Sequence, residues 1–305
     1  MPNITLLGTG GMLPLKDRFL TSLYVEQNGN AILIDCGEGT QVAFAQHGLK
    51  LSKIRAIFIT HSHADHVAGL AGLLLSLGNT GRSDALPIFC GDSAVDTIQH
   101  LLAVTGGLPF DVHLHRLPEN QSTTIKINKI DPLLQIDTLP LKHRVPCLGY
   151  RLTFAKKPEF QPQQAKALDI PVQYWKQLHS GETVTLPDGR KIDSVQVTGE
   201  PRPPIKITYT TDTLPISEIV DFAKDSDLFI CEGMWGTFDK KESMNQKCHM
   251  LMQDACTLAK KANVKRLWLT HYSPAEKEPE IYAEELQQIY ETVIISKDGQ
   301  EIILK

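Results

Sequence analysis

Four side chains of the types that bind metal ions stand within six residues of this sequence. His61, His63, Asp65 and His66 follow directly after the apolar run at residues 57–59. Because a strand points successive side chains to opposite faces, the first two histidines share one side, and the turn that follows brings the other pair to a second position. Imidazole favours zinc and similar ions, and paired ligands suit two ions roughly 3.5–4 Å apart that share a bridging water. The segment predicts a dinuclear metal site at the end of a buried strand.

Three further ligand candidates stand alone, each where an apolar strand-like segment ends. Taken singly, a His or Asp in such a place is commonly a cap or a turn residue. Two zinc ions, however, need about seven or eight protein ligands plus a bridging water, including one carboxylate suited to bridge them. The predicted set is His61, His63 and His143 on one metal, Asp65, His66 and His271 on the other, and Asp212 between them.

Length and composition fit a single sizeable enzyme domain. Of the 305 residues, 42% are apolar and 22% are charged, as in ordinary globular proteins. The sequence has no run of 18 apolar residues, and its first residues lack the basic start and apolar stretch of a signal peptide, so we expect a cytoplasmic protein with no membrane partner. Six cysteines without a Cys-x-x-Cys pair argue against a disulfide framework or a structural zinc ribbon.

The charge balance excludes a general nucleic-acid binder. The formal net charge is −4 and the sequence pI is about 6.3, whereas such proteins usually have a pI above about 9. A polyanionic substrate would therefore be met by local positive charge. Residues 155–206 show a mild bias of this kind, with eight basic and six acidic side chains.

Apolar strand-like runs alternate with helical patterns along most of the chain, which predicts α/β layers with sheets covered by helices. The expected strands are 4–7, 22–25, 31–35, 56–60, 86–90, 148–154, 205–209, 228–231 and 266–269, and the expected helices are 41–46, 67–77, 94–104, 216–223, 251–261 and 280–290. Residues 156–204, rich in proline and glutamine, break this pattern. We therefore expect a single domain over residues 1–305, with 156–204 as an inserted flexible arm that is a candidate for substrate binding.

The ligand pattern, a His-x-His-x-Asp-His segment followed by separate His, Asp and His residues, resembles the metallo-β-lactamase superfamily. Within it the chain is similar to the ribonuclease Z family, the tRNA 3′-processing endonucleases. The supporting segments are Leu-Leu-Gly-Thr-Gly at 6–10, Asp-Cys-Gly-Glu-Gly-Thr-Gln at 35–41, Gly-Tyr-Arg at 149–151, Gly-Glu-Thr-Val at 181–184 and Leu-Pro-Asp-Gly-Arg at 186–190. The resemblance implies an αβ/βα sandwich with two Zn²⁺ per chain, a homodimer, and removal of 3′ trailers from precursor tRNA that leaves a 3′-hydroxyl.

Two departures from the family pattern stand out. Asp212 follows Tyr-Thr-Thr in place of the usual Ser-Gly or Phe-Gly, although the carboxylate itself is retained. The arm lacks the usual Pro-Pro-Gly-Pro and has Ile-Pro-Val-Gln-Tyr-Trp at 170–175. Because that Gly-Pro segment belongs to the part that grips tRNA in the family, an alternative stays open: a dinuclear-zinc phosphodiesterase or other esterase that acts on a small substrate.

The ligand set and the resemblance together imply catalytic roles, the first for Asp65 and the second for His249 and Glu232. Asp65 would ligate or orient the attacking water and accept its proton. His249 aligns with the family's catalytic histidine and would protonate the leaving 3′-oxygen, and Glu232 aligns with the glutamate that orients it. Such a carboxylate would raise the pKa of the imidazole and favour its acid form. Asp35 is expected to hydrogen-bond a ligand histidine.

Overall fold

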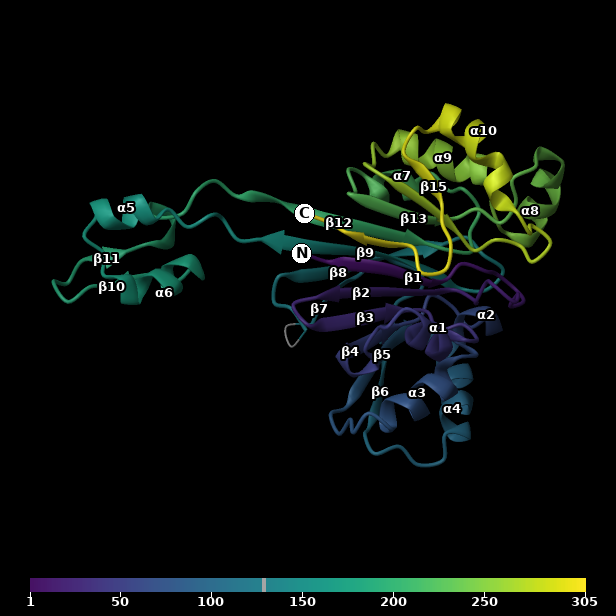
Figure 1. The fold of residues 1–305 in the computed structure, drawn as a ribbon, viewed down its shortest axis with the longest axis horizontal. Coiled ribbons are helices and arrows are strands. Elements are labelled where there is room, and N and C mark those ends of the chain that lie inside the picture. Colours follow the sequence, from purple (N-terminus) through teal and green to yellow (C-terminus); the bar gives the residue numbers. More distant parts are fainter. Residues whose placement is uncertain (128–129) are drawn as a thin grey trace. The chain divides into compact units, whose positions relative to one another are not determined.

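Two compact units make up the chain (Figure 1). The computed structural model describes residues 1–127 and 130–305. The first unit comprises Met1–Leu152 and Lys206–Lys305, and the second comprises Thr153–Ile205. The second unit therefore falls on the segment whose composition departs from the rest of the chain.

The first unit contains a seven-stranded mixed sheet built from the amino-terminal part of the chain and one carboxy-terminal strand. Four neighbouring strands pair antiparallel and three further ones follow in parallel. In spatial order the strands are β16 (Glu301–Ile303), β1 (Asn3–Gly8), β2 (Ser22–Gln27), β3 (Asn30–Ile34), β4 (Ile54–Phe58), β5 (Leu86–Gly91) and β6 (Val112–Leu117).

A second seven-stranded sheet contains the later strands. Its strands β12 to β15 run parallel, and β7 and β8 pair antiparallel. In spatial order they are β15 (Val293–Ile295), β14 (Leu267–Thr270), β13 (Leu228–Glu232), β12 (Arg202–Thr210), β9 (Cys147–Lys156), β8 (Leu134–Leu141) and β7 (Thr124–Lys126). The two sheets meet where the Tyr150 ring packs edge-on against Phe58, with centroids 5.4 Å apart, and its hydroxyl donates to the Ile59 carbonyl over 2.6 Å.

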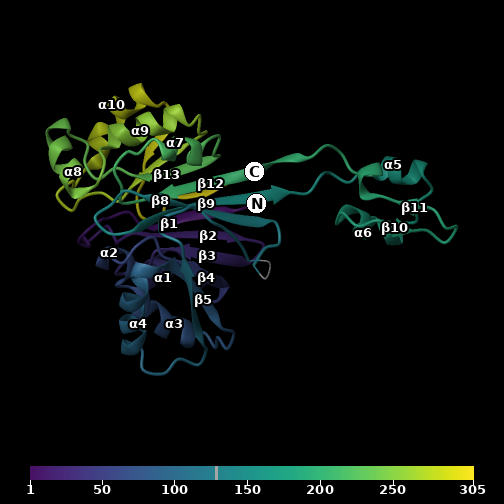
Figure 2. The same cartoon turned by 180° about the vertical axis from the view of Figure 1, so that it is seen from behind.

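Helices cover the outer face of each sheet (Figures 1 and 2), which confirms the predicted αβ/βα sandwich. Beside the first sheet lie α1 (Thr40–Gln46), α3 (Leu70–Gly78) and α4 (Val95–Val104), and beside the second lie α7 (Glu218–Ala223), α9 (Met252–Lys261) and α10 (Ala283–Ile289). Alternate strand residues such as Leu33 and Ile57 pack against Leu73 and Leu77 of α3, all fully buried. Each such side chain contributes about 1.5–3 kcal/mol of burial free energy.

Two predicted helices are interrupted. The pattern at 67–77 forms α2 (Ala64–Val67) and α3, with a break at Gly69. A side chain there would place its Cβ 2.1 Å from the Gly37 carbonyl oxygen, so the close approach of two main-chain segments requires glycine and ends the first helix. The pattern at 280–290 forms a 3₁₀ turn, Pro279–Tyr282, and then α10. The remaining short elements of this unit are α8 (Lys241–Lys247) and 3₁₀ turns at Leu51–Lys53, Asp92–Ala94 and Phe238–Lys240.

The second unit has a small hydrophobic core of its own. It contains α5 (Pro162–Ala167), α6 (Trp175–His179), the hairpin β10 (Val184–Thr185) with β11 (Lys191–Ile192), and 3₁₀ turns at Val172–Tyr174 and Ser194–Gln196. Seven buried apolar residues, among them Ile170 and Leu178, form the core. Tyr174 and Trp175 pack partly buried against it, and the indole N–H donates to the Ile170 carbonyl over 3.0 Å. These aromatic side chains therefore support the unit itself.

Candidate metal centre

The predicted site residues converge because they follow strands that end at the same edge. Glu232 is the last residue of β13, Asp212 lies two residues after β12, and His271 directly follows β14. These three strands are parallel neighbours, and the carboxyl ends of parallel strands meet at one edge of a sheet. His61 comes from the first sheet and lies shortly after the end of β4.

The structure brings His61, His63, His143 and Asp212 into one group. His63 Nδ1 lies 3.0 Å from His61 Nε2 and 3.2 Å from His143 Nε2. The Asp212 Oδ2 atom lies 3.7 Å from His61 Nε2 and 3.6 Å from His143 Nε2. One donor atom from each residue thus surrounds a common point.

Asp65, His66, Asp212 and His271 form a second group. The Asp212 Oδ1 atom lies 3.2 Å from His66 Nε2 and 3.0 Å from His271 Nε2. Asp65 Oδ2 lies 3.3 Å from His271 Nε2 and 3.7 Å from His66 Nε2. The two oxygens of Asp212 are therefore divided between the groups, as a bridging carboxylate requires.

The donor atoms fit two metal ions. Four ligands placed tetrahedrally at about 2.0–2.1 Å from a zinc ion lie about 3.3–3.4 Å from one another, close to the 3.0–3.7 Å separations of both groups. The His66 and His271 Nε2 atoms are only 3.2 Å apart, and two unprotonated ring nitrogens at that distance repel each other unless a cation lies between them. The chemistry of the donors, imidazole with carboxylate, is that of a divalent transition-metal site.

Hydrogen bonds on the far side of the rings set the histidine tautomers. His66 Nδ1 lies 2.8 Å from Asp35 Oδ2, the contact expected of Asp35 with a proposed ligand histidine, and Asp35 Oδ1 accepts the Thr60 main-chain N–H over 2.8 Å. His143 Nδ1 lies 3.0 Å from the Cys248 carbonyl oxygen. A proton on Nδ1 leaves Nε2 of each ring free to bind a metal ion.

At four of these ligands the electrostatics favour the metal-binding protonation state. Burial, together with the neighbouring His66, holds the pKa of His61 well below its usual value. Burial also lowers the pKa of His63 and that of His143. Burial would raise the pKa of Asp212, but the surrounding histidines outweigh it and hold that pKa well below its usual range. Neutral imidazoles and an ionised carboxylate are the forms that ligate metal ions. At His66 burial lowers the pKa, but the charges of Asp212 and Asp35 outweigh burial and hold that pKa well above its usual value, so that a metal ion would displace a proton there.

His249 and Glu232 form a separate pair beside the ligands. His249 Nδ1 lies 2.9 Å from Glu232 Oε2, and the other glutamate oxygen accepts the Thr213 main-chain N–H. Burial lowers the pKa of His249, but the charge and hydrogen bond of Glu232 outweigh burial and raise that pKa to about 9. In the absence of bound cations this pKa favours the acid form of the imidazole near neutral pH.

A cavity of about 230 Å³ opens onto the groups, and three of its lining residues, Met12, Ala64 and Arg144, were not predicted from the sequence. Arg144 is exposed at the rim, and only its place directly after His143 could have indicated it. The main-chain N–H of Met12 donates to Asp65 Oδ2 over 2.7 Å. Because any residue but proline carries this group, no sequence signal points to it.

Comparisons with known proteins show what the chain is similar to. A family model described as Anti-Pycsar protein Apyc1 matches residues 2–109. Ribonuclease Z of Clostridium acetobutylicum is 43% identical over 98% of this chain and 96% of its own length, and Ribonuclease Z of Clostridioides difficile is 40% identical over 98% and 97%. The crystal structure of the short form of human tRNase Z covers 99% of both chains with a TM-score of 0.70 at 23% identity. That of the metallo-β-lactamase fold protein YhfI from Bacillus subtilis covers 99% of this chain and 98% of its own with a TM-score of 0.69 at 19% identity.

Two helix-covered sheets with a His/Asp cluster at their edge define a protein of the metallo-β-lactamase fold. The full-length identity to curated relatives is more specific. The chain belongs to the ribonuclease Z family and is a hydrolase. The family and fold predicted from the sequence are thereby confirmed. Within the described residues, no helix combines the length and apolar character needed to cross a membrane.

Proposed function

We propose that this chain is a zinc-dependent endoribonuclease that removes 3′ trailers from precursor tRNA and leaves a 3′-hydroxyl on the tRNA. The division of the two Asp212 oxygens between the ligand groups, at 3.0 Å and 3.6 Å from their nearest ring nitrogens, carries the proposal of a dinuclear centre. Relatives named Ribonuclease Z, at 37–43% identity over nearly the whole chain, support the substrate class.

Two zinc ions per chain would be held by seven residues. His61, His63 and His143 would bind one, Asp65, His66 and His271 the other, and Asp212 both. When bound, such a pair clamps the scissile phosphate and lowers the pKa of the attacking water.

The remaining chemistry belongs to the protein's own groups. Asp65 orients the attacking water and accepts its proton. His249 donates a proton to the departing 3′-oxygen, and its elevated pKa of about 9 keeps that proton available at neutral pH. Glu232 holds the ring by Nδ1, so that Nε2 is the atom that carries the transferable proton. The product ends are a 3′-hydroxyl on the tRNA and a 5′-phosphate on the trailer.

The second unit supplies the proposed docking surface for the body of the tRNA. Lys157, Lys166 and Lys176 are exposed and Lys156 is partly exposed. Among the described residues none of these four lysines forms an ion pair, so their charge is available to phosphates. We also propose a cytoplasmic homodimer in which the arm of one subunit serves the site of the other. The six cysteines, all free thiols, support a reducing compartment.

The small-substrate alternative is weaker. It rests on the missing Pro-Pro-Gly-Pro segment of the arm, whereas the curated relatives with identities of 37–43% are named Ribonuclease Z. A single experiment separates the two readings. Protein of known zinc content is incubated with a 3′-extended tRNA, and the ends of both products are mapped. A cut at the acceptor stem with a 3′-hydroxyl on the tRNA supports the proposal, and hydrolysis confined to small phosphodiesters contradicts it.

A further inference from the structure

Among the described residues, the loop between β1 and β2 donates the only main-chain hydrogen bond to the side chain of Asp65, the proposed water-orienting carboxylate. Met12 adopts a left-handed conformation with φ 67, which costs a non-glycine residue of order 1 kcal/mol or more. In that conformation its N–H donates to Asp65 Oδ2 over 2.7 Å. This is the same oxygen that faces His271 Nε2 at 3.3 Å. The hydrogen bond from this strained turn therefore holds Asp65 Oδ2, the oxygen that faces the other proposed metal ligands.

Gly11, the residue before Met12, lies directly against the ring of His271. A Cβ on Gly11 would lie 2.6 Å from the Cε1 atom of His271, so only glycine permits the main chain to cross this ring. The Gly11 N–H donates to the Tyr272 carbonyl, and the Tyr272 N–H donates to the Thr9 carbonyl, each over 2.9 Å. The loop is thus paired with the segment that carries His271.

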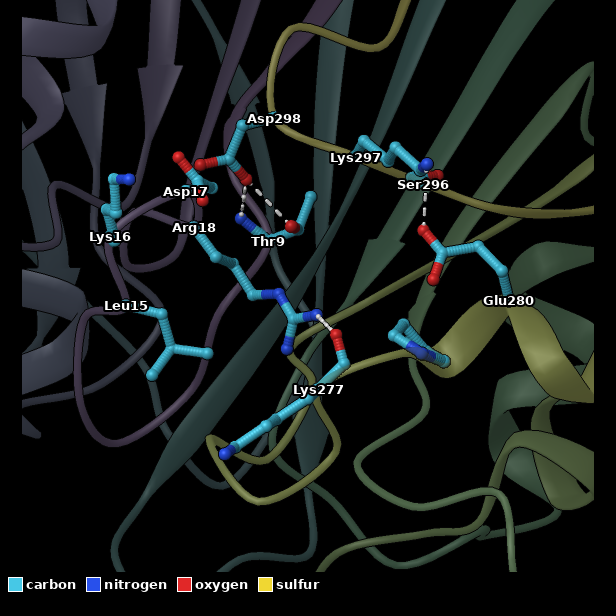
Figure 3. A pocket seen from close by; sticks show the side chains of 11 residues that line it. Thr9, Leu15, Lys16, Asp17, Arg18, Lys277, Glu280, Ser296, Lys297 and Asp298 are labelled. Carbon is cyan, nitrogen blue, oxygen red and sulfur yellow. Dashed lines mark hydrogen bonds and ion pairs between the residues drawn. The ribbon is translucent and has the colours of Figure 1, made fainter.

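Both ends of the loop are held by one partly buried carboxylate far away in the sequence. Asp298 Oδ1 accepts the Thr9 N–H over 2.9 Å and the Thr9 hydroxyl over 2.7 Å, and Oδ2 accepts the Phe19 N–H. Figure 3 shows the Asp298 carboxylate facing Thr9 in a cavity of about 560 Å³. All of these contacts lie within the first unit.

A second anchor lies on the other wall of that cavity. The Arg18 guanidinium donates to the main-chain oxygens of Glu276 and Lys277 over 2.8 Å and 3.1 Å, the latter visible in Figure 3. Its Cζ atom also lies 5.2 Å from the centre of the Tyr272 ring. Arg18 thereby ties the loop to the stretch that follows His271.

We propose that Asp298 is a positioning residue for Asp65: it closes the loop from Thr9 to Phe19, and the closed loop presents the Met12 N–H that orients the Asp65 carboxylate. The inference rests on the proposed function of Asp65. Asp298 itself touches neither substrate nor metal in this scheme. Partners in such an outer layer typically affect metal affinity or activity by about 10–100-fold.

The test combines two changes that act on the same chain of contacts. Asp298→Asn keeps the volume but replaces one acceptor oxygen by a donor, so that either the Thr9 or the Phe19 N–H loses its partner. Incorporating the α-hydroxy analogue of methionine at position 12 turns the Gly11–Met12 amide into an ester. The change removes the Met12 N–H without altering a side chain, and it also weakens the Gly11 carbonyl as the acceptor of the Leu13 N–H. Lys297→Gln is the matched control, since the side chain of this neighbour is 72% exposed and its ammonium pairs with Glu280 over 3.0 Å.

Zinc affinity by chelator competition and kcat on precursor tRNA are measured for each protein, with circular dichroism as the check of folding. We expect each single change to weaken zinc binding or kcat by about 10–100-fold, and the double variant to lose no more than the larger single loss, because both changes break one path. Unchanged zinc affinity and kcat in the ester protein, or losses that multiply in the double variant, would overturn the inference. A parent protein that binds zinc but does not cut precursor tRNA would refute the proposed function, while the zinc-affinity comparison would still decide the positioning role.

Discussion

Replacing Glu232 by glutamine should change the pH dependence of the reaction more than its maximal rate. The glutamate is fully buried and lies 2.9 Å from His249 Nδ1, and its charge raises the pKa of that imidazole against the effect of burial, to about 9. The amide retains the shape but not the charge, and its one acceptor oxygen can serve either His249 or the Thr213 main-chain N–H but not both. The pKa of His249 should then fall to the ordinary histidine value of about 6.5 or lower, because burial is no longer opposed.

The size of the effect follows from the two protonated fractions. At pH 8 an imidazole of pKa about 9 is roughly 90% protonated and one of pKa about 6.5 roughly 3%, a difference of about 30-fold in available acid. At pH 6 the protonated fractions of the two imidazoles differ by less than about twofold. Bound metal cations lower the pKa of His249 in the parent protein and in the variant alike. The predicted quantity is therefore the separation between the alkaline limbs of the two kcat–pH profiles, about two pH units or more.

The assay is kcat on precursor tRNA from pH 5.5 to 9.5 for the parent protein and for Glu232→Gln, with Glu242→Gln, an exposed glutamate of α8, as control. A small phosphodiester with an activated leaving group serves as the second substrate, because its leaving group needs no proton and its rate should not show the shift. Alkaline limbs that coincide in the two proteins, or a shift of equal size on both substrates, would refute the role of His249 as the acid and of Glu232 as its partner.

Three further outcomes are expected. Alanine at any one of the seven proposed metal ligands should abolish turnover and leave the fold largely intact by circular dichroism, since the loss of a ligand removes the activation of the nucleophile; His143→Ala with two zinc ions per chain and near-native activity would contradict that assignment. Deleting residues 156–204 should weaken precursor-tRNA binding and reduce the salt dependence of log K by close to one unit per lost phosphate contact, with hydrolysis of the small activated diester retained; unchanged affinity and slope would instead favour the small-substrate reading. Removal of zinc by a chelator should lower the thermal midpoint, and added zinc should restore it in a concentration-dependent way, because the ions bind the folded ligand set; a midpoint that does not respond to zinc would count against the site.

The local sequence pattern was sufficient to predict the helix-covered layers and to identify the residue types that make up the site. Alternation of apolar runs and helical patterns predicts sheets covered by helices because each sheet must bury one face against helices, and the resemblance to the metallo-β-lactamase superfamily supplied the two-sheet sandwich; the observed architecture agrees with both. The interruption at Gly69 was not predictable, since it arises from contact with Gly37, 32 residues earlier in the sequence. Helical periodicity reports which side of a helix is apolar and carries no signal for such a crossing.

For the candidate site, the sequence by itself determined which side chains are available: four ligand types within six residues, and single residues placed where strands end. Only the tertiary structure decided how they are used. It divided the two oxygens of Asp212 between the groups, set the tautomer of His66 through Asp35, and aimed the Met12 N–H at Asp65. The physical reason is that the residue type alone sets the chemistry of a side chain. The distances between segments far apart in the sequence are set only when the sheets pack. The same holds for the direction of main-chain N–H groups, which nearly every residue possesses.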